Sequence, residues 1–463
     1  MKKVQTKKPI SIGLVSLGCS KNAVDLQVMA GHLLKRGCVL APNPDQADVI
    51  LVNTCAFIES AREEAAAEIL RACDLKRAGQ CRAVIVSGCF AQRYGDRFAE
   101  VFPDVDAVVG IDALDKISAV VKQVTAEKPS TAKSVENVIY GGCWTTLNAG
   151  APMTQEKVFD SPSPALRFTG QAFAYLKIAE GCAHRCAYCA IPAIRGNYRS
   201  RALKSILAEA KALLATGVKE LNVIAQDPML YGVDLGMKNG LVELLTALDK
   251  LKGEFWIRVL YSYPSEITDA FLSWLATSPH AAKYVDVPLQ HTDPRILKAM
   301  ARGVAAKATL EAAERIRAAV PGVTLRTTVM TGFPGETSDS FAKLLMDVKR
   351  MQFDHLGAFA FSPEEGTVAA EMAGRPLART AEKRRVEVMA AQKKIWAAKA
   401  KKFVGKTFKA LVTAPGEARL ESQAPDVDGF VRIPAATPVG EFVMLRITRV
   451  RGYDFDGVVE ART

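Results

Sequence analysis

The chain has 463 residues, of which 49% are hydrophobic and 24% charged, a composition typical of a globular protein with several cores. No apolar run is long enough to span a membrane, and the basic N-terminus lacks a signal-peptide cleavage site, so we expect a cytoplasmic protein with no membrane partner. The net charge of +12 favours an anionic partner such as RNA or a ribonucleoprotein, although a generally basic surface would give the same charge.

Ten cysteines occur along the chain. In a reducing compartment disulfides are rare, so metal binding or catalysis explains cysteines better than cross-linking does. Their positions relative to the predicted strands therefore carry much of the functional information.

Three short apolar runs in the N-terminal third each end in a cysteine. They are "SIGLVSLGC", "ADVILVNTC" and "CRAVIVSGC", which end in Cys19, Cys55 and Cys89. Runs rich in β-branched residues are typical of buried parallel strands, and helical stretches at 24–36 and 60–78 separate them. With a fourth apolar stretch at 105–110, this alternation predicts an α/β domain with a doubly wound parallel sheet.

The placement of these three cysteines predicts a shared site. The carboxyl ends of parallel strands meet at one edge of a sheet, so Cys19, Cys55 and Cys89 should converge there. The alternative is three unrelated core residues, because free cysteine is often buried. Four other cysteines do not share this placement and are interpreted as structural: Cys38, Cys73, Cys81 and Cys143.

A second alternation of strands and helices begins after a segment rich in Lys, Ser, Thr, Pro and Gly, which is typical of a linker. Six strands are expected, at 172–179, 219–226, 255–260, 284–290, 323–330 and 355–362. Because a closed TIM barrel has eight such units, we expect an open, partial (β/α)6 barrel. The predicted boundaries are 9–125 for the first domain, 126–167 for the linker, 168–401 for the barrel domain and 402–463 for a third domain.

The first barrel strand runs directly into "GCAHRCAYCAIPAIRG", in which Cys182, Cys186 and Cys189 are spaced C-x3-C-x2-C. A loop after this strand lies at the carboxyl mouth of the barrel, where such folds place their chemistry. Three cysteines with no fourth close behind leave a four-ligand metal site one ligand short.

Polar segments after the later strands should lie at the same mouth. The segments "AQD", "PLQH" and "GFPGE" supply the candidate binding residues Gln226, Asp227, Gln290, Gly332 and Glu336. The glycines of "GFPGE" would let the backbone approach a ligand closely, although a plain turn has the same composition.

Charged residues in and after the cysteine motif have two interpretations. His184 is interpreted as a surface or packing residue rather than a metal ligand. The basic run Arg195, Arg199 and Arg201 either meets anionic cofactor or substrate groups or forms a solvated basic face.

The C-terminal region changes character at about residue 402. Short apolar runs at 408–415, 429–434, 441–450 and 455–460 are separated by turns rich in Gly and Pro. This close spacing predicts a small antiparallel β-barrel.

Together these segments resemble one enzyme family. C-x3-C-x2-C after a first barrel strand is similar to the motif of radical S-adenosylmethionine (SAM) enzymes. The segments "SLGCSKNAVD", "NTCAFIESAREE" and "SGCFAQRY" resemble the N-terminal domain of the methylthiotransferases in that family, and the C-terminal barrel resembles their TRAM domain. Within the family, "GCAHRC" and "SQAPDVDG" are similar to the branch that modifies an aspartate of the small-subunit ribosomal protein S-twelve.

The resemblance implies SAM and two 4Fe-4S clusters as cofactors, each cluster with one open iron. Cys182, Cys186 and Cys189 would hold the cluster that chelates SAM, and Cys19, Cys55 and Cys89 an auxiliary cluster that binds sulfide. Thiolates suit iron–sulfur clusters, whereas a zinc site would need a second Cys or His pair nearby. Gln226, Asp227, Gln290, Gly332 and Glu336 become candidate SAM contacts, and no catalytic residue is assigned beyond the cluster ligands.

The implied reaction is transfer of a methylthio group to the β-carbon of the aspartate. A radical derived from SAM removes hydrogen from this unactivated carbon, which no side-chain acid or base could do. The implied partners are ribosomal protein S-twelve or the ribosomal subunit, a reduced electron carrier and a sulfide donor.

Three other functions remain open. An electron carrier would need four cysteines per cluster, and an RNA-binding module would leave six cysteines unexplained. A tRNA adenosine methylthiotransferase of the same family would need the same six cysteines, so they do not separate it from the ribosomal-protein branch.

Overall fold

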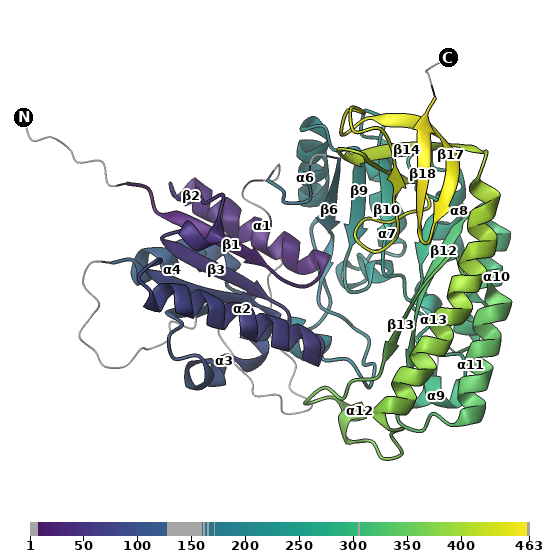
Figure 1. Cartoon of the computed structure of the whole chain (residues 1–463), viewed down its shortest axis with the longest axis horizontal. Coiled ribbons are helices and arrows are strands. Elements are labelled where there is room, and N and C mark those ends of the chain that lie inside the picture. The colour runs from purple at the N-terminus through teal and green to yellow at the C-terminus, as the bar shows by residue number, and fades with distance from the viewer. Residues whose placement is uncertain are drawn as a thin grey trace, which may run out of the picture. The chain divides into compact units, whose positions relative to one another are not determined.

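The computed structural model describes residues 8–126, 160, 163, 166–170, 172–303 and 306–460 (Figure 1). Its contacts divide the chain into two compact units, which are described separately below. Unit 1 takes in residues up to 168 together with 181–183 and 189–199, and unit 2 takes in 169–180, 184–188 and 200–463. Cys143 and almost all of the predicted linker at 126–167 lie outside the described residues.

Unit 1 contains a five-stranded parallel sheet in the order β2-β1-β3-β4-β5. The four predicted strands are present, and a short edge strand is added that the sequence analysis did not identify. The strands are β1 (Ser11–Ser16), β2 (Val39–Leu40), β3 (Val49–Thr54), β4 (Ala83–Gly88) and β5 (Ala107–Val109).

Helices cover both faces of this sheet, because alternate strand residues point in opposite directions. Ile85 belongs to a core that includes residues of α1 and α4, whereas Val84 and Val86 belong to a core that includes residues of α2 and α3. The doubly wound architecture is therefore confirmed. The helices of unit 1 are α1 (Ser20–Lys35), α2 (Glu59–Arg77), α3 (Cys89–Val101), α4 (Ile117–Val124) and the short α5 (Ile191–Arg195).

Unit 2 contains the predicted six parallel barrel strands, which form two hydrogen-bonded groups, β6-β9-β10 and β11-β12-β13. The groups meet where Ser262 N donates to Asp286 O at 2.8 Å and Ile257 N donates to His280 O at 2.7 Å. The partial barrel is therefore confirmed. Its strands are β6 (Phe173–Lys177), β9 (Glu220–Ile224), β10 (Trp256–Val259), β11 (Tyr284–Asp286), β12 (Thr324–Thr331) and β13 (His355–Ala360).

The longest helix of unit 2, α13, was not identified from the sequence. It packs against β13 and α11, and Val388 and Ile395 of α13 share a core with Leu344 of α11 (Figure 1). The helices of the unit are α6 (Leu203–Ala215), α7 (Gly240–Asp249), α8 (Asp269–Thr277), α9 (Pro294–Ala299), α10 (Ala306–Ala319), α11 (Ser338–Met351), α12 (Val368–Glu371) and α13 (Ala378–Ala400).

Short elements complete the described chain. The two-residue strands β7 (Ala179–Glu180) and β8 (Arg199–Ser200) flank the cysteine motif. Single 3-10 turns are η1 (Pro44–Gln46), η2 (Leu114–Lys116), η3 (Pro228–Leu230), η4 (Val233–Leu235), η5 (Pro264–Glu266) and η7 (Lys401–Phe403). Among the helices that the structure describes, none combines the length and apolar character needed to cross a bilayer.

The C-terminal strands close into a five-stranded barrel in the order β14-β15-β16-β18-β17. The neighbouring strands pair antiparallel except β16 and β18, which pair parallel. The small barrel was predicted, but short β15 and the parallel pair were not. The strands are β14 (Thr407–Ala414), β15 (Glu417–Leu420), β16 (Val431–Arg432), β17 (Phe442–Arg451) and β18 (Asp454–Val459).

The connection between β15 and β16, residues 421–428, contacts the strands of the (β/α)6 barrel, and we call it the plug segment. The Tyr175 hydroxyl of β6 donates to Asp426 Oδ2 at 2.6 Å. The Tyr284 hydroxyl of β11 donates to Asp428 Oδ2 at 2.7 Å. Tyr284 is the first residue of β11, and His355, which contacts Ser422 O at 2.9 Å, is the first residue of β13, so the plug segment sits at the end of the barrel opposite the predicted mouth.

Asp428 is the most connected residue of the plug segment. It is 2% exposed, and its Oδ1 lies 3.3 Å from His355 Nδ1 of β13 and 3.7 Å from Arg326 Nε of β12. Its Oδ2 also accepts from Ala424 N at 2.9 Å, which closes a turn within the plug segment. One buried carboxylate therefore links the small barrel to three strands of the large one.

A buried charge cluster lies beside the plug segment. Arg258 Nε of β10 donates to Glu220 Oε1 of β9 at 2.7 Å, and Arg419 of β15 pairs with the other oxygen of Glu220. Burial alone would raise the pKa of Glu220, but the two guanidinium groups lower it. Because Arg258 Nη1 also donates to Glu421 O at 2.8 Å, the small barrel is held to the large barrel by polar contacts that are out of water.

Candidate functional site

The structure brings Cys19, Cys55 and Cys89 to one edge of the unit 1 sheet. Cys19 caps α1 directly after β1, Cys55 follows β3, and Cys89 begins α3 directly after β4. Cys55 and Cys89 are buried and Cys19 is exposed. Burial raises the pKa of the Cys89 thiol to about 12, and Cys19 and Cys55 lie close enough to add to that effect.

The strand order explains why this edge collects a site. The chain leaves β1 toward β2 on one side, while β3, β4 and β5 follow on the other. The carboxyl end between β1 and β3 is thus a topological switch point, which is where open α/β sheets bind ligands. Cys19 and Cys55 come directly after these two strands.

Two glycines allow the three chain segments to approach one another. A Cβ atom on Gly18 would lie 2.7 Å from Cys55 Cβ, and one on Gly88 would lie 2.4 Å from Thr54 O. Both residues also have φ near +90°, at +92° and +93°. Only glycine combines this backbone conformation with so close an approach.

The unit 1 site contains a buried polar network that the sequence analysis did not identify. Arg195, which is 1% exposed, donates from Nη2 to Asn22 Oδ1 at 2.6 Å and to Cys89 Sγ at 3.3 Å. Asn22 Nδ2 in turn donates to Thr54 O at 2.8 Å. Of the two interpretations of the basic run, a solvated face is therefore wrong for Arg195, and for Arg201, which is 4% exposed.

The loop with the C-x3-C-x2-C motif is shared between the two units. Cys182 and Cys189 fall in unit 1 and Cys186 in unit 2, and all three are partly buried. In unit 1, Cys182 N donates to Gly196 O at 3.2 Å. In unit 2, Ala187 N donates to Met300 O at 3.0 Å, so backbone hydrogen bonds fix both parts of the loop.

Side chains from the barrel mouth hold the middle of this loop. His184 Nε2 lies 2.6 Å from Asp227 Oδ2, and the His184 ring stacks on Tyr263 with centroids 3.7 Å apart. The guanidinium carbon of Arg302 lies 4.1 Å from the centre of the Tyr263 ring, and Arg302 Nη1 donates to Cys186 Sγ at 3.7 Å. His184 is thus a packing residue within the described part of the chain, as the sequence analysis interpreted it.

Gln226 and Asp227 occupy different environments although they are adjacent. Gln226 Nε2 donates to Glu180 Oε1 at 2.8 Å, while Gln226 Oε1 is buried without a hydrogen-bond partner among the described residues. Asp227 uses Oδ2 for His184 and Oδ1 to accept from Met229 N at 3.0 Å. Gln226 therefore keeps an acceptor for a ligand, whereas both oxygens of Asp227 are engaged within the protein.

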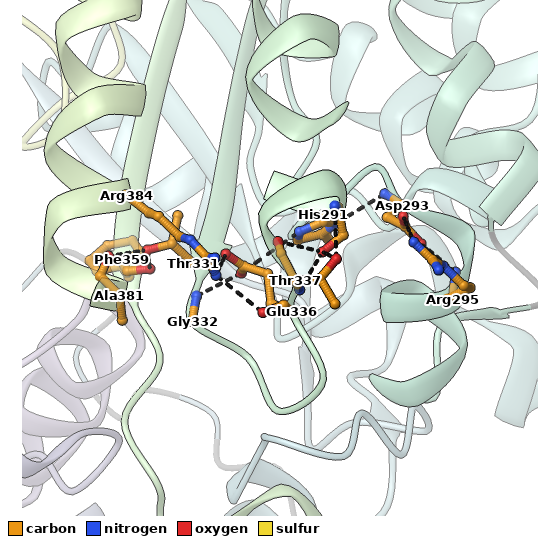
Figure 2. Close-up of polar contacts among 11 residues, drawn as sticks. His291, Asp293, Arg295, Thr331, Gly332, Glu336, Thr337, Phe359, Ala381 and Arg384 are labelled. Carbon is orange, nitrogen blue, oxygen red and sulfur yellow. Dashed lines mark hydrogen bonds and ion pairs between the residues drawn. The ribbon is translucent and has the colours of Figure 1, made fainter. Parts of the chain in front are cut away.

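Gly332 and Glu336 belong to a compact network behind the barrel mouth (Figure 2). Gly332 N donates to Glu336 Oε2 at 2.6 Å, and Arg384 of α13 donates to Glu336 Oε1 at 2.8 Å. A Cβ atom on Gly332 would lie 2.2 Å from Ala381 Cβ, so the close approach made by this glycine is to α13. These contacts account for both residues without a ligand, and their role in SAM binding stays a prediction.

Strained backbone marks the mouth at two residues other than glycine. Gln290, which follows β11, has φ +67°, and Tyr261, which follows β10, has φ +73°. Such conformations cost about 1–3 kcal/mol and concentrate at ligand sites. Tyr261, Tyr263 and Arg302 were not singled out from the sequence, although "YSYP" directly after a strand could have drawn attention to the two tyrosines.

The residues present fit iron–sulfur clusters better than a single metal ion. Within the described ranges, no three Cys, His, Asp or Glu side chains are placed to hold one ion. A cubane binds its thiolates through different irons, so its ligands stand further apart than those of a single ion. Two sets of three cysteines supply the soft thiol ligands that iron–sulfur clusters take, and Gln226 adds an unpartnered acceptor at the barrel mouth.

Comparison with protein families divides the chain into three matched regions. Residues 11–110 match the uncharacterized protein family UPF0004, residues 176–348 the radical SAM superfamily, and residues 404–459 the TRAM domain. The order agrees with the three parts predicted from the sequence.

Similar proteins match from end to end. The chain is 38% identical to the ribosomal protein uS12 methylthiotransferase RimO of Opitutus terrae, 39% identical to that of Akkermansia muciniphila and 40% identical to that of Elusimicrobium minutum. Each alignment covers 96% of this chain, and they cover 96%, 99% and 98% of the relatives.

Solved structures share the fold at low identity. Two structures of the radical SAM methyltransferase TsrM from Kitasatospora setae are 15% identical to the chain, with TM-scores of 0.51 and 0.52. They cover 78% and 75% of this chain, and the match covers 77% and 72% of the TsrM chains. At this identity the likeness shows the fold alone.

Proposed function

The chain belongs to the RimO family of ribosomal protein uS12 methylthiotransferases, which are radical SAM enzymes, and we propose that it transfers a methylthio group to the β-carbon of an aspartate of uS12. The observation that carries this proposal is the identity of 38–40% with RimO proteins over 96% of the chain. A match of that extent includes all three parts of the chain rather than the radical SAM region alone.

We assign one 4Fe-4S cluster to each set of three cysteines. Cys182, Cys186 and Cys189 would hold the cluster that binds SAM, and Cys19, Cys55 and Cys89 the auxiliary cluster. When bound, these groups supply the one-electron chemistry that breaks SAM and the iron site that carries sulfide.

The protein's own residues orient and shield this chemistry. The stack of His184 on Tyr263 and the hydrogen bond from Ala187 N fix the loop around Cys186. Gln226 Oε1 offers an acceptor to the ammonium or hydroxyl groups of SAM. In unit 1, Gly18 and Gly88 allow the segments that carry Cys19, Cys55 and Cys89 to approach one another closely, which supports a shared cluster.

The reaction needs partners beyond uS12. Reductive cleavage of SAM consumes an electron, so we infer a reduced electron carrier, and the added sulfur requires a sulfide donor. A substrate that belongs to the ribosome favours the cytoplasm as the place of action.

The substrate is tested with anaerobically reconstituted protein supplied with SAM, a reductant and sulfide. Either uS12 or bulk tRNA is added, and the product is analysed by mass spectrometry. We expect the mass of one methylthio group on the uS12 aspartate and none on tRNA. A gain on tRNA alone would refute the assignment and identify the tRNA adenosine branch.

A further inference from the structure

Each of the two cysteine sites contains one arginine that is buried and donates to a cysteine sulfur. In unit 1, Arg195 Nη2 lies 3.3 Å from Cys89 Sγ. In unit 2, Arg302 Nη1 lies 3.7 Å from Cys186 Sγ. The exposed fractions of the two arginines are 1% and 4%.

Arg302 is a buried cation without a carboxylate partner among the described residues. Its Nη2 donates to Pro288 O at 2.9 Å, its guanidinium stacks on Tyr263, and its Nε has no hydrogen-bond partner there. A carbonyl and a phenol are neutral at neutral pH, so neither balances the charge. Burying an unbalanced cation is costly, and the group that Arg302 faces is the sulfur of Cys186, which would be an anionic thiolate when it binds a cluster.

Arg195 is held differently. Its Nη2 lies 3.0 Å from Asp25 Oδ2, and Asp25 is itself 1% exposed. The charge of Arg195 is therefore balanced within the protein, while its N–H group still points at Cys89 Sγ. Both arginines thus donate a hydrogen bond to a cysteine sulfur, but only Arg195 has its charge balanced by a neighbouring carboxylate.

We propose that Arg302 and Arg195 are positioning residues that set the reduction potentials of the two clusters, Arg302 for the SAM-binding cluster and Arg195 for the auxiliary cluster. The inference rests on the proposed function, because it requires a cluster at each site. Hydrogen bonds to ligand sulfur and nearby positive charge stabilise the reduced, more negative state of a cluster. Loss of either arginine should therefore make its own cluster harder to reduce and leave the other unchanged.

Arg302 has no carboxylate partner among the described residues and Arg195 has Asp25, so the two substitutions change the local charge in different ways. Replacing Arg302 removes a hydrogen-bond donor and an unbalanced charge, whereas replacing Arg195 removes a donor and leaves Asp25 as an unpaired anion. Both changes move a potential in the negative direction. The charge-preserving Arg302→Lys should recover most of the shift, because the ammonium still faces Cys186.

The test is a redox titration of the reconstituted full-length protein, followed by electron paramagnetic resonance. Cys182→Ala and Cys55→Ala first assign each signal to its cluster by deleting the other one. Arg302→Gln should shift only the midpoint potential of the SAM-binding cluster, and Arg195→Gln only that of the auxiliary cluster. Arg258→Gln, which alters a buried arginine that contacts Glu220 and the plug segment, is the matched control and should shift neither.

The outcomes are distinguishable. Wild-type protein that takes up no cluster at one site overturns the proposed function before any variant is compared. With both clusters present, unchanged potentials in Arg302→Gln and Arg195→Gln overturn the inference, as does an equal shift in Arg258→Gln. If Arg302→Gln loses the SAM-binding cluster, Arg302→Lys decides: a retained cluster with a midpoint potential near that of wild type supports the inference, whereas loss of the cluster in both variants overturns it.

Discussion

Individual residues at the barrel mouth are constrained mainly by how closely they pack. Gly332 and Gly335 lie in one turn and both have positive φ, at +76° and +84°, but only Gly332 faces a neighbour. A Cβ atom on Gly332 would lie 2.2 Å from Ala381, whereas one on Gly335 would meet nothing within 4 Å. The pair therefore separates the cost of strained backbone from the cost of a steric clash.

We expect Gly332→Ala to lower the free energy of unfolding by about 3–5 kcal/mol, the sum of backbone strain and overpacking against α13. Gly335→Ala should lower it by only about 1 kcal/mol, because it meets the strain alone. Urea unfolding of both variants measures the difference. Equal losses would show that α13 moves aside and that the packing of Ala381 does not limit this turn.

His291 makes the stability of the protein depend on pH. Burial lowers the pKa of His291 to about 4, and its Nδ1 accepts from Asp293 N at 2.9 Å, so the ring is neutral with the proton on Nε2 (Figure 2). An unfolded histidine binds a proton near pH 6.5, so the unfolded state binds more protons between pH 6.5 and 4. The contribution of His291 to the free energy of unfolding is therefore fully present above pH 6.5 and is lost as the pH falls toward 4.

The expected loss from His291 is on the order of 3 kcal/mol between pH 7 and 4. Burial raises the pKa of Glu336, which acts in the opposite sense because the folded state then binds its proton more readily. Unfolding free energies of wild type and His291→Gln, measured from pH 7 to 5, test this. The variant should show a flatter profile, and parallel profiles would contradict a buried neutral ring.

At the residue scale, sequence reasoning predicted the cysteines but not their partners. Cys19, Cys55 and Cys89 were found because each follows an apolar run, and strand direction then brings them to one edge. Arg195 was noticed only as part of the basic run after the motif and Arg302 was not noticed, since the burial of both depends on segments distant in sequence. The placement of a charged side chain in a core is a tertiary property that composition and periodicity do not contain.

The plug segment, at the scale of elements, joins the small C-terminal barrel to the large one. Asp428 contacts Tyr284, Arg326 and His355, which come from three neighbouring strands. Hydrogen bonds and ion pairs are directional, so a carboxylate with this many partners specifies the position of the segment. The element is defined by its contacts rather than by regular secondary structure.

Asp428→Asn should lower the free energy of unfolding by about 1–3 kcal/mol, because a neutral amide replaces the buried carboxylate that accepts from Tyr284 and faces Arg326, while Arg326 keeps its ion pair with Asp286. Asp74→Asn, which breaks an exposed ion pair with Arg77, is the control and should cost no more than about 1 kcal/mol. Thermal and urea unfolding measure both. Similar small losses would show that water replaces Asp428 and that the plug segment is loosely held.

Strands were predicted from the sequence where a continuous run of apolar residues is bounded by turn or polar residues. All six strands of the large barrel were predicted, since buried parallel strands are apolar on both faces. Strands β2 and β15 were missed because neither forms a continuous apolar run: β2 has two residues, and β15, with the sequence EARL, has two charged residues among its four. Helix α13 was missed because its buried positions, such as Val388, Gln392 and Trp396, mix apolar with polar residues and give no clear stripe.

Considered as a whole molecule, the chain distributes the proposed cluster ligands over both units, with Cys186 in unit 2 and the other five cysteines in unit 1. The two proposed sets of ligands share no residue, so each cluster can be removed by its own substitution. Cys182→Ala and Cys55→Ala should each retain about half of the wild-type iron. Cys73→Ala, which removes a buried cysteine of the sheet core, should retain all of it.

Iron analysis and SAM cleavage assays separate these variants. We expect Cys182→Ala to abolish cleavage of SAM, and Cys55→Ala to preserve cleavage while abolishing methylthio transfer. If Cys73→Ala lost iron as Cys55→Ala does, iron loss would reflect general damage to the sheet. If Cys182→Ala and Cys55→Ala both kept full activity, the assignment of two clusters would be wrong.

The plug segment also determines how parts of this protein can be exchanged with those of its relatives. A chimera that joins this barrel to a foreign C-terminal domain near residue 402 would place unmatched side chains against Tyr175, Tyr284 and Arg326. A hybrid that carries residues 421–428 along with their barrel partners would keep every one of these contacts. A functional exchange between relatives should therefore include both the C-terminal barrel and the strand residues that the plug segment contacts. Substitutions in the plug segment and in those strand residues should occur together among relatives.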